Sequence, residues 1–218
     1  MLQSWLAPNM RAPQGGLIGW FAQNLMVKFN SISSIEIINR LQLDTLGDGD
    51  SSLSVVELGP GNGFSMTELI ASKKCKTIHG VEISQRFRDL LGDKFKADID
   101  SGLLSIHDND AKDLSFLEDS SIDAIYALNV IYFLNPLEEY LTELRRVCKP
   151  DAKVIFGVCD TVKRNDEVVF VNQDWDVCMD KMKDAGFSNV EISEEIACGD
   201  MNFYFISSLA GKTGNTMN

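Results

Sequence analysis

The chain has 218 residues, 20 of them basic and 32 acidic, which gives a formal net charge of −12 at pH 7. An acidic chain without a dense basic patch repels phosphate backbones, so these counts argue against a nucleic-acid partner. Hydrophobic residues make up 44% of the chain, enough to bury the core of one domain.

The first predicted elements are two amphipathic helices within residues 17–43, broken near Asn30 and Ser31. Their many large apolar side chains lead us to expect a lid over a binding cleft; the alternative is an ordinary helix packed on the sheet edge. Residues 15–27 are too short and too polar to span a bilayer, and no secretory signal is evident. We therefore expect a cytoplasmic protein with no membrane partner.

Strands and helices then alternate along the chain, after a turn-rich loop at residues 46–52. This order predicts a parallel sheet with helices on both faces. The expected strands lie near residues 54–58, 77–82, 103–107, 122–127 and 152–158, and the expected helices lie near 64–72, 84–91 and 136–148.

The end of the chain follows a different pattern. A helix is expected from Trp175 to Ala185, with Gly186 as its C-cap. Two strands, at residues 187–192 and 202–206, follow with no long helix between them, so they are most simply antiparallel. The prediction is an α/β fold: a Rossmann-like, seven-stranded mixed sheet with its last strand antiparallel, helices on both faces and an N-terminal helical lid.

Residues 54–63 carry the most informative motif, Ser-Val-Val-Glu-Leu-Gly-Pro-Gly-Asn-Gly. Val55 and Val56 suit a buried parallel strand, and the three glycines form a turn that leads into a helix N-terminus. The spacing G-x-G-x-G differs from the G-x-G-x-x-G that binds NAD and FAD, and no G-x-x-x-x-G-K-[ST] is present for a triphosphate. Glu57 disfavours a pyrophosphate and suits the ammonium group of an amino-acid-bearing ligand.

A second acid follows at the end of the next predicted strand. Glu82 lies 19 residues beyond Gly63, close to the offset of about 20 residues at which a carboxylate reaches the ribose in dinucleotide folds. A role as a cofactor ligand is therefore favoured over a strand-end acid in solvent.

With these motifs the chain resembles the class I S-adenosylmethionine-dependent methyltransferases, whose first motif is E/D-x-G-x-G-x-G. The resemblance covers roughly residues 20–209 and includes Asn109-Asp110-Ala111 where the family has Gly-Asp-Ala. It implies S-adenosyl-L-methionine as cofactor, with Glu82 on the ribose hydroxyls and Asp110 on the adenine amine. The cofactor-binding residues that the resemblance implies are Glu57, Gly59, Pro60, Gly61, Gly63, Glu82, Ile83, Asp110, Ala111 and Asn129.

Two positions depart from the family pattern. The family has Gly-Gly after the Lys-Pro that ends a helix, and this chain has Asp151-Ala152, which alters only a loop far from the cofactor. Asn109 replaces the glycine before Asp110, and asparagine tolerates left-handed backbone better than most residues.

The acceptor site is predicted beside the loop after the fourth strand, which related small-molecule methyltransferases place against the methyl group. Tyr132 or Phe133 lines the acceptor pocket, or both pack a helix instead. Trp20 and Asn30 from the lid are further candidates. His107 is a candidate base, with a buried structural histidine as the alternative. Two histidines, five cysteines and no C-x-x-C imply no metal and suit a reducing compartment.

The interpretation is a single methyltransferase domain over residues 1–211, with a helical cap at 1–45 and a flexible tail at 212–218. Its expected function is in-line methyl transfer from S-adenosyl-L-methionine to a small-molecule acceptor. The alternative is a catalytically silent S-adenosylmethionine-binding partner or sensor protein. A third hypothesis, a Rossmann-type dehydrogenase, conflicts with the glycine spacing.

Overall fold

The computed structural model of the protein describes residues 32–46, 52–159, 170–198 and 201–211. Residues 32–41 are helical, and a short 3-10 turn, η1 (Leu43–Thr45), follows them. The strands are β1 (Leu53–Leu58), β2 (Cys75–Val81), β3 (Leu104–His107), β4 (Ile122–Leu128), β5 (Cys148–Cys159), β6 (Phe187–Ile192), β7 (Ile196–Cys198) and β8 (Met201–Ala210). The other helices are α3 (Phe64–Ala71), α4 (Gln85–Lys94), α5 (Lys96–Asp100), η2 (Ile131–Phe133, 3-10), α6 (Leu137–Val147) and α7 (Trp175–Asp184).

The strands form one sheet in the order β3-β2-β1-β4-β5-β8-β6, and the short β7 pairs with β8. Neighbouring strands from β3 to β5 are parallel, whereas β8 runs antiparallel to both β5 and β6. The chain steps outward from β1 to β3 and then returns to β4 on the other side of β1. Such a reversal leaves a crevice at the carboxyl ends of the strands, where ligands bind in open α/β sheets.

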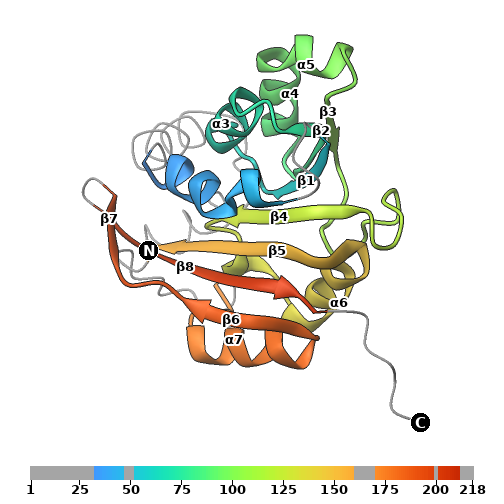
Figure 1. Cartoon of the computed structure of the whole chain (residues 1–218). Helices are drawn as coiled ribbons and strands as arrows, with labels where there is room; N and C mark the ends of the chain where they lie inside the picture. The colour runs from blue at the N-terminus through green and yellow to red at the C-terminus, as the bar shows by residue number, and fades with distance from the viewer. Residues whose placement is uncertain (1–31, 47–51, 160–169, 199–200, 212–218) are drawn as a thin grey trace.

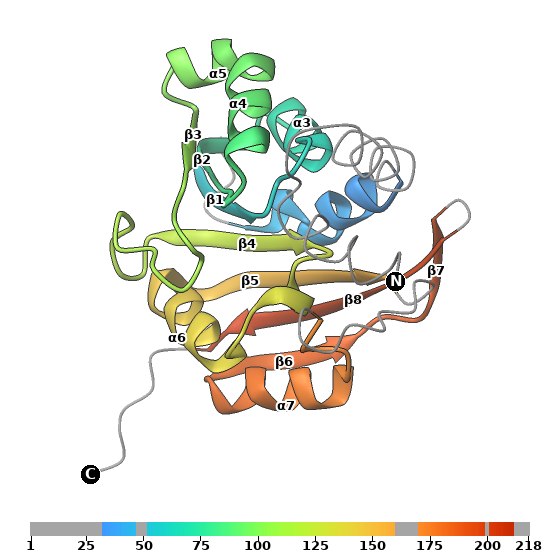
Figure 2. The same ribbon diagram turned by 180° about the vertical axis from the view of Figure 1, so that it is seen from behind.

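Each face of the sheet carries its own core. One core packs residues 32–41, α3 and α4 against strand residues that include Val55 and Tyr126. The other packs α6 and α7 against residues that include Val56 and Ile125. Successive strand residues point to opposite faces, so adjacent residues of β1 and of β4 enter different cores. Figures 1 and 2 show α3, α4 and α5 grouped beside β1–β3, with α6 and α7 near β5, β8 and β6.

The predicted mixed sheet with its antiparallel last strand is confirmed. Three details differ. β5 begins at Cys148, earlier than predicted, because Cys148 is already extended where α6 ends. The unpredicted α5 follows α4 because Phe95 leaves the helical conformation between them. β7 is an eighth strand too short to show in the sequence pattern. Of the predicted cap at 1–45, residues 32–45 fall within the described part of the chain. The described residues contain no helix long and apolar enough to cross a membrane.

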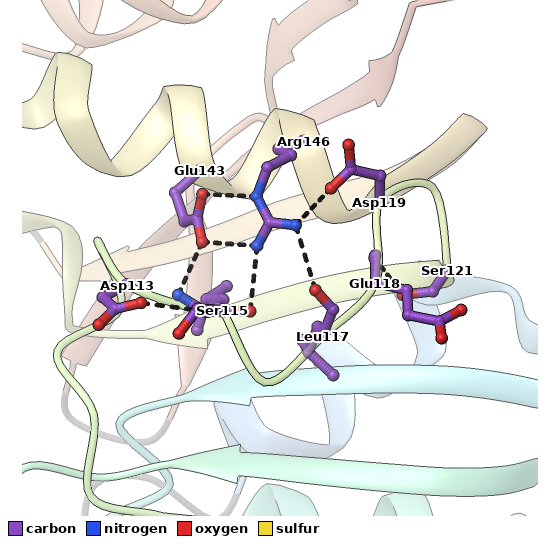
Figure 3. Close-up of polar contacts among 9 residues, drawn as sticks. Asp113, Ser115, Leu117, Glu118, Asp119, Ser121, Glu143 and Arg146 are labelled. Atoms are coloured by element: carbon purple, nitrogen blue, oxygen red, sulfur yellow. Dashed lines mark hydrogen bonds and ion pairs between the residues drawn. The ribbon is translucent and has the colours of Figure 1, made fainter.

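A network around Arg146 fixes the loop between β3 and β4 (Figure 3). The guanidinium on α6 donates to both carboxylate oxygens of Glu143, at 2.8 and 2.7 Å. It also donates to the carbonyl oxygens of Leu114, at 3.0 Å, and Leu117, at 3.1 Å. Glu143 in turn accepts a hydrogen bond from the Leu114 N–H at 2.7 Å. The fork geometry of arginine therefore ties α6 to a loop that begins beside the crevice.

Candidate functional site

The crevice at the switch point holds a pocket of about 990 Å³, a volume that includes solvent at its mouth. Its walls come from the carboxyl ends of β1, β2 and β4, the glycine turn before α3, the segment after β3 and the turn after β4. The lining residues are Ser34, Glu57, Leu58, Gly59, Pro60, Gly61, Asn62, Phe64, Ser65, Val81, Glu82, Ile83, Phe87, Asn109, Asp110, Ala111, Leu128, Asn129, Val130, Phe133, Leu134 and Tyr140.

The turn between β1 and α3 is left-handed at three glycines. The φ angles are +62° at Gly59, +54° at Gly61 and +72° at Gly63. The Gly59 N–H donates to the Val81 carbonyl at 2.8 Å, and the Gly63 N–H donates to the Pro60 carbonyl at 2.8 Å. The turn is thus closed on β2 and on itself, in a conformation that residues with a Cβ adopt only at a cost.

The glycines of this turn have different roles. Gly59 and Gly61 line the pocket, as predicted, but Gly63 lies outside the lining. A Cβ on Gly63 would lie 2.5 Å from Phe95 Cε2 and 2.7 Å from Leu91 Cδ2. The structure therefore gives Gly63 a packing role, because its missing side chain lets the start of α3 approach the end of α4, and its predicted ligand contact stays a prediction.

Two glycine variants are expected to separate these roles. Gly63→Ala combines a left-handed φ with clashes against the buried side chains of Phe95 and Leu91, so its free energy of unfolding should fall by about 2–3 kcal/mol. Gly61→Ala meets nothing closer than the Gly59 carbonyl at 4.0 Å, so strain alone should cost about 1–2 kcal/mol. Gly61 lines the pocket, so a methyl group added there should weaken ligand binding. Urea unfolding and ligand titration measure the two effects; equal losses of stability would contradict the assignment.

Glu57 lies near the end of β1, is 1% exposed and lines the pocket. Its Oε1 accepts a hydrogen bond from the Ser65 hydroxyl, and its Oε2 accepts one from the Tyr126 hydroxyl at 2.8 Å. Burial raises the pKa of Glu57 to about 7, although both hydroxyl hydrogen bonds act in the opposite direction. The charge of this carboxyl group therefore changes near neutral pH.

Glu82 follows β2 and is 4% exposed. Its Oε2 accepts a hydrogen bond from the Gly61 N–H at 3.0 Å, and its Oε1 accepts one from the Ser84 N–H at 2.8 Å. Burial raises the pKa of Glu82, and the two backbone donors lower it in part. Each carboxylate oxygen keeps lone-pair capacity, so the group can accept further hydrogen bonds from ligand hydroxyls.

Asn129 is the first residue after β4 and has a left-handed φ of +58°. Its N–H donates to the Gly157 carbonyl at 2.8 Å, which fixes the residue at the pocket. Within the described residues, its side-chain Oδ1 is buried and has no hydrogen-bond partner. A buried acceptor without a donor is costly, so this atom indicates a ligand that donates a hydrogen bond.

The expected cofactor fits this donor and acceptor set. Three carboxyl groups line the pocket, those of Glu57, Glu82 and Asp110, and none of the described lining residues is Lys, Arg or His. Such a lining attracts a cation and repels phosphate. S-adenosylmethionine carries a sulfonium and an ammonium group, and it offers ribose hydroxyls and an adenine amine as hydrogen-bond donors. Ala111 and Ile83, also predicted, add apolar surface to the lining.

The predicted acceptor residues are only partly brought together. Phe133 lines the pocket, but Tyr132 does not. Tyr132 is 1% exposed, and its hydroxyl donates to the Cys159 carbonyl at 3.1 Å and accepts from the Cys159 N–H at 2.6 Å. The structure therefore places Tyr132 in a packing and hydrogen-bonding position outside the lining residues, and its role in the acceptor pocket stays a prediction. Trp20 and Asn30 lie outside the described residues.

His107 has a structural environment instead of a catalytic one. Its Nε2 lies 3.1 Å from His79 Nδ1, and its ring stacks on Phe116 with centroids 3.7 Å apart. Burial lowers the pKa of His107 to about 4. The residue is not among those that line the pocket, so its surroundings favour the structural alternative over the candidate base.

Sequence reasoning missed the hydroxyl groups that surround Glu57. Tyr126 on β4 is the register partner of Glu57 on β1, so both side chains point to the same face. Ser65 reaches the same carboxylate from the first turn of α3. The sequence pattern of β4 shows that the Tyr126 side chain points to one face of the sheet. Only the pairing of β1 with β4 identifies Glu57 as its partner.

The chain matches known proteins in sequence and in fold. Residues 56–156 match a family model described as a methyltransferase domain. The highly reducing polyketide synthase resH of Aspergillus sclerotiorum is 25% identical over 138 residues, which cover 59% of this chain. The chain spans about 5% of the length of the curated relatives it matches.

Two solved structures share the fold. The CurJ carbon methyltransferase has a TM-score of 0.67 and 17% identity, over 94% of this chain and 61% of that one. Phosphoethanolamine N-methyltransferase 2 of Haemonchus contortus, solved with S-adenosyl-L-methionine, has a TM-score of 0.67 and 12% identity, over 97% of this chain and 60% of that one. At these identities the likeness establishes the fold.

Proposed function

We propose that the chain methylates a small-molecule acceptor by in-line transfer, on the premise that residues 56–156 belong to a methyltransferase domain of the class I, S-adenosylmethionine-dependent kind. One observation carries the proposal: the pocket at the switch point joins a left-handed glycine turn, three carboxyl groups and the unpartnered Oδ1 of Asn129. The similarity to a carbon methyltransferase and to polyketide synthases supports an acceptor of small-molecule size.

Particular residues are assigned to particular parts of the cofactor. Glu82 accepts hydrogen bonds from the ribose hydroxyls, and Asp110 accepts one from the adenine amine. Asn129 Oδ1 accepts one from the ammonium group, which the nearby ionised Glu57 also attracts. These assignments give the buried Asn129 Oδ1 a hydrogen-bond donor and pair the pocket's negative charge with a positive one. An unpartnered acceptor and an unpaired charge are both costly in a buried site.

The remaining residues contribute alignment and exclusion of water. The bound cofactor supplies a methyl group on a sulfonium, with a thioether as leaving group. Val130, Phe133 and Leu134 give the pocket an apolar wall, which strengthens electrostatic interactions by excluding water. A wall of this kind holds the acceptor in line with the methyl group. Such alignment is the main requirement of a displacement that already has a good leaving group.

Methyl-labelled S-adenosylmethionine, incubated with the protein and a low-molecular-weight metabolite extract, tests the proposal. We expect label in a small molecule by mass spectrometry, and none when the Glu82→Ala variant replaces the wild type. Label confined to protein or RNA added in parallel would contradict a small-molecule acceptor. Cofactor binding without any transfer would support the silent binding protein instead.

A further inference from the structure

Residues 170–173 lie against the turn that follows β4. The Val171 N–H donates to the Tyr132 carbonyl at 2.9 Å. The Asn172 side-chain Nδ2 donates to two further carbonyls, that of Ile131 at 2.8 Å and that of Leu134 at 2.7 Å. Asn172 is 8% exposed. Because both partners are carbonyl oxygens, the amide nitrogen, and not the oxygen, must face them.

The other side of the same turn is the pocket wall. Val130, Phe133 and Leu134 line the pocket, and a Cβ on Gly59 would lie 2.7 Å from Val130 Cγ2. The wall therefore touches the glycine turn directly. A shift of the wall would change the width of the pocket at this point, since Val130 has no free space on the glycine side.

We infer that Asn172 is a positioning residue for the ligand pocket. It fixes the turn after β4 through two backbone carbonyls, and it lies outside the residues matched by the family model, 56–156. The hydrogen bonds from Val171 and from the Tyr132 hydroxyl fix other atoms of the turn. The Ile131 carbonyl also accepts from the Leu134 N–H at 3.2 Å, but that hydrogen bond lies within the turn and does not tie it to residues 170–173. The inference rests on the proposed use of this pocket as the cofactor site.

Asn172→Asp is the sharpest variant because it keeps the shape and replaces the donor. An ionised carboxylate would face two carbonyl oxygens and repel both, whereas a protonated carboxyl group has one O–H to donate. We expect the Kd for S-adenosylhomocysteine at pH 8 to rise about tenfold or more over the wild type, a loss of about 1.4 kcal/mol. The ratio of variant to wild-type Kd should shrink as pH falls toward 5.

Gln173→Glu is the matched control. Gln173 Nε2 donates to the Phe170 carbonyl at 2.9 Å, inside the same segment, so its variant adds the same charge without touching the turn. Its Kd should stay within about twofold of the wild type. Asn172→Ala should weaken binding at every pH, without the recovery in acid, and it serves in place of Asn172→Asp if that variant does not fold.

Hydrogen exchange of residues 131–134 without ligand gives a second measurement that needs no cofactor. Exchange should be faster in the Asn172 variants than in the wild type and in Gln173→Glu. Unchanged exchange at these amides, or an unchanged Kd with a lowered melting temperature, would overturn the inference and leave Asn172 a structural residue. A wild type that fails to bind S-adenosylhomocysteine would contradict the proposed function, and the exchange result would still decide the role of Asn172.

Discussion

Replacing Glu82 with alanine is expected to raise the Kd for S-adenosylhomocysteine by about 100-fold, a loss of about 2.8 kcal/mol. The physical reason is twofold. The variant would lose the charge-assisted hydrogen bonds from the ribose hydroxyls to the carboxylate, each worth about 1.5–3 kcal/mol. The variant would also leave the Gly61 and Ser84 N–H groups without the carboxylate oxygens that now accept their hydrogen bonds. Titration calorimetry at pH 7.5 measures the change, with circular dichroism to establish that the variant is folded.

Asp110→Ala is the comparison. Asp110 lines the same pocket but is assigned a single hydrogen bond to the adenine amine, so its loss should raise the Kd about tenfold. Equal small effects of the two substitutions on a folded protein would contradict the ribose assignment of Glu82. A larger rise in Kd for Asp110→Ala than for Glu82→Ala would show that Asp110 contributes more to cofactor binding than Glu82.

Cofactor affinity is expected to fall as the pH decreases from 8 to 6. Burial raises the pKa of Glu57 from its ordinary 4.5 to about 7, so the group loses its negative charge over this range. The ammonium group of S-adenosylmethionine prefers the ionised carboxylate, and affinity should fall by up to about tenfold per pH unit below 7. Binding titrations of the wild type and Glu57→Gln test this; the same slope in both proteins would exclude Glu57 as its source.

The stability of the ligand-free protein should change in the opposite direction. Folded Glu57 keeps its proton up to about pH 7, while the unfolded chain releases it near 4.5. The folded state thus binds more protons between these values, and its contribution to the free energy of unfolding decreases as the pH rises from 4.5 to 7, then levels off. Urea unfolding of Glu57→Gln should lack this particular decrease.

Much of this fold and part of this site could be predicted because their signals are local. Alternating strand and helix patterns predicted the mixed sheet, and the missing helix between the last two long strands predicted the antiparallel β8. The acids Glu57 and Glu82 end adjacent parallel strands, so their meeting at one edge follows from topology alone.

The rest depends on contacts between distant parts of the chain. The pairing of Glu57 with Tyr126 requires the register of β1 and β4, which no single strand reveals. Gly63 looks like a ligand glycine in the motif, yet Phe95 and Leu91 decide its role. Tyr132 is an aromatic residue in the turn after β4, but its hydroxyl is hydrogen-bonded in the core to the backbone of Cys159 on β5. Asn172 stands in no motif, and only the folded turn supplies its partners.

The most direct measurement of the central claim is a calorimetric titration of the wild type with S-adenosylmethionine, S-adenosylhomocysteine, NAD and ATP under identical conditions. An acidic pocket with a G-x-G-x-G turn and a buried unpartnered acceptor should bind the first two ligands at one site per chain. It should show no binding of NAD or ATP, whose phosphates the three carboxyl groups repel. Binding of NAD as tight as that of S-adenosylmethionine would contradict the account.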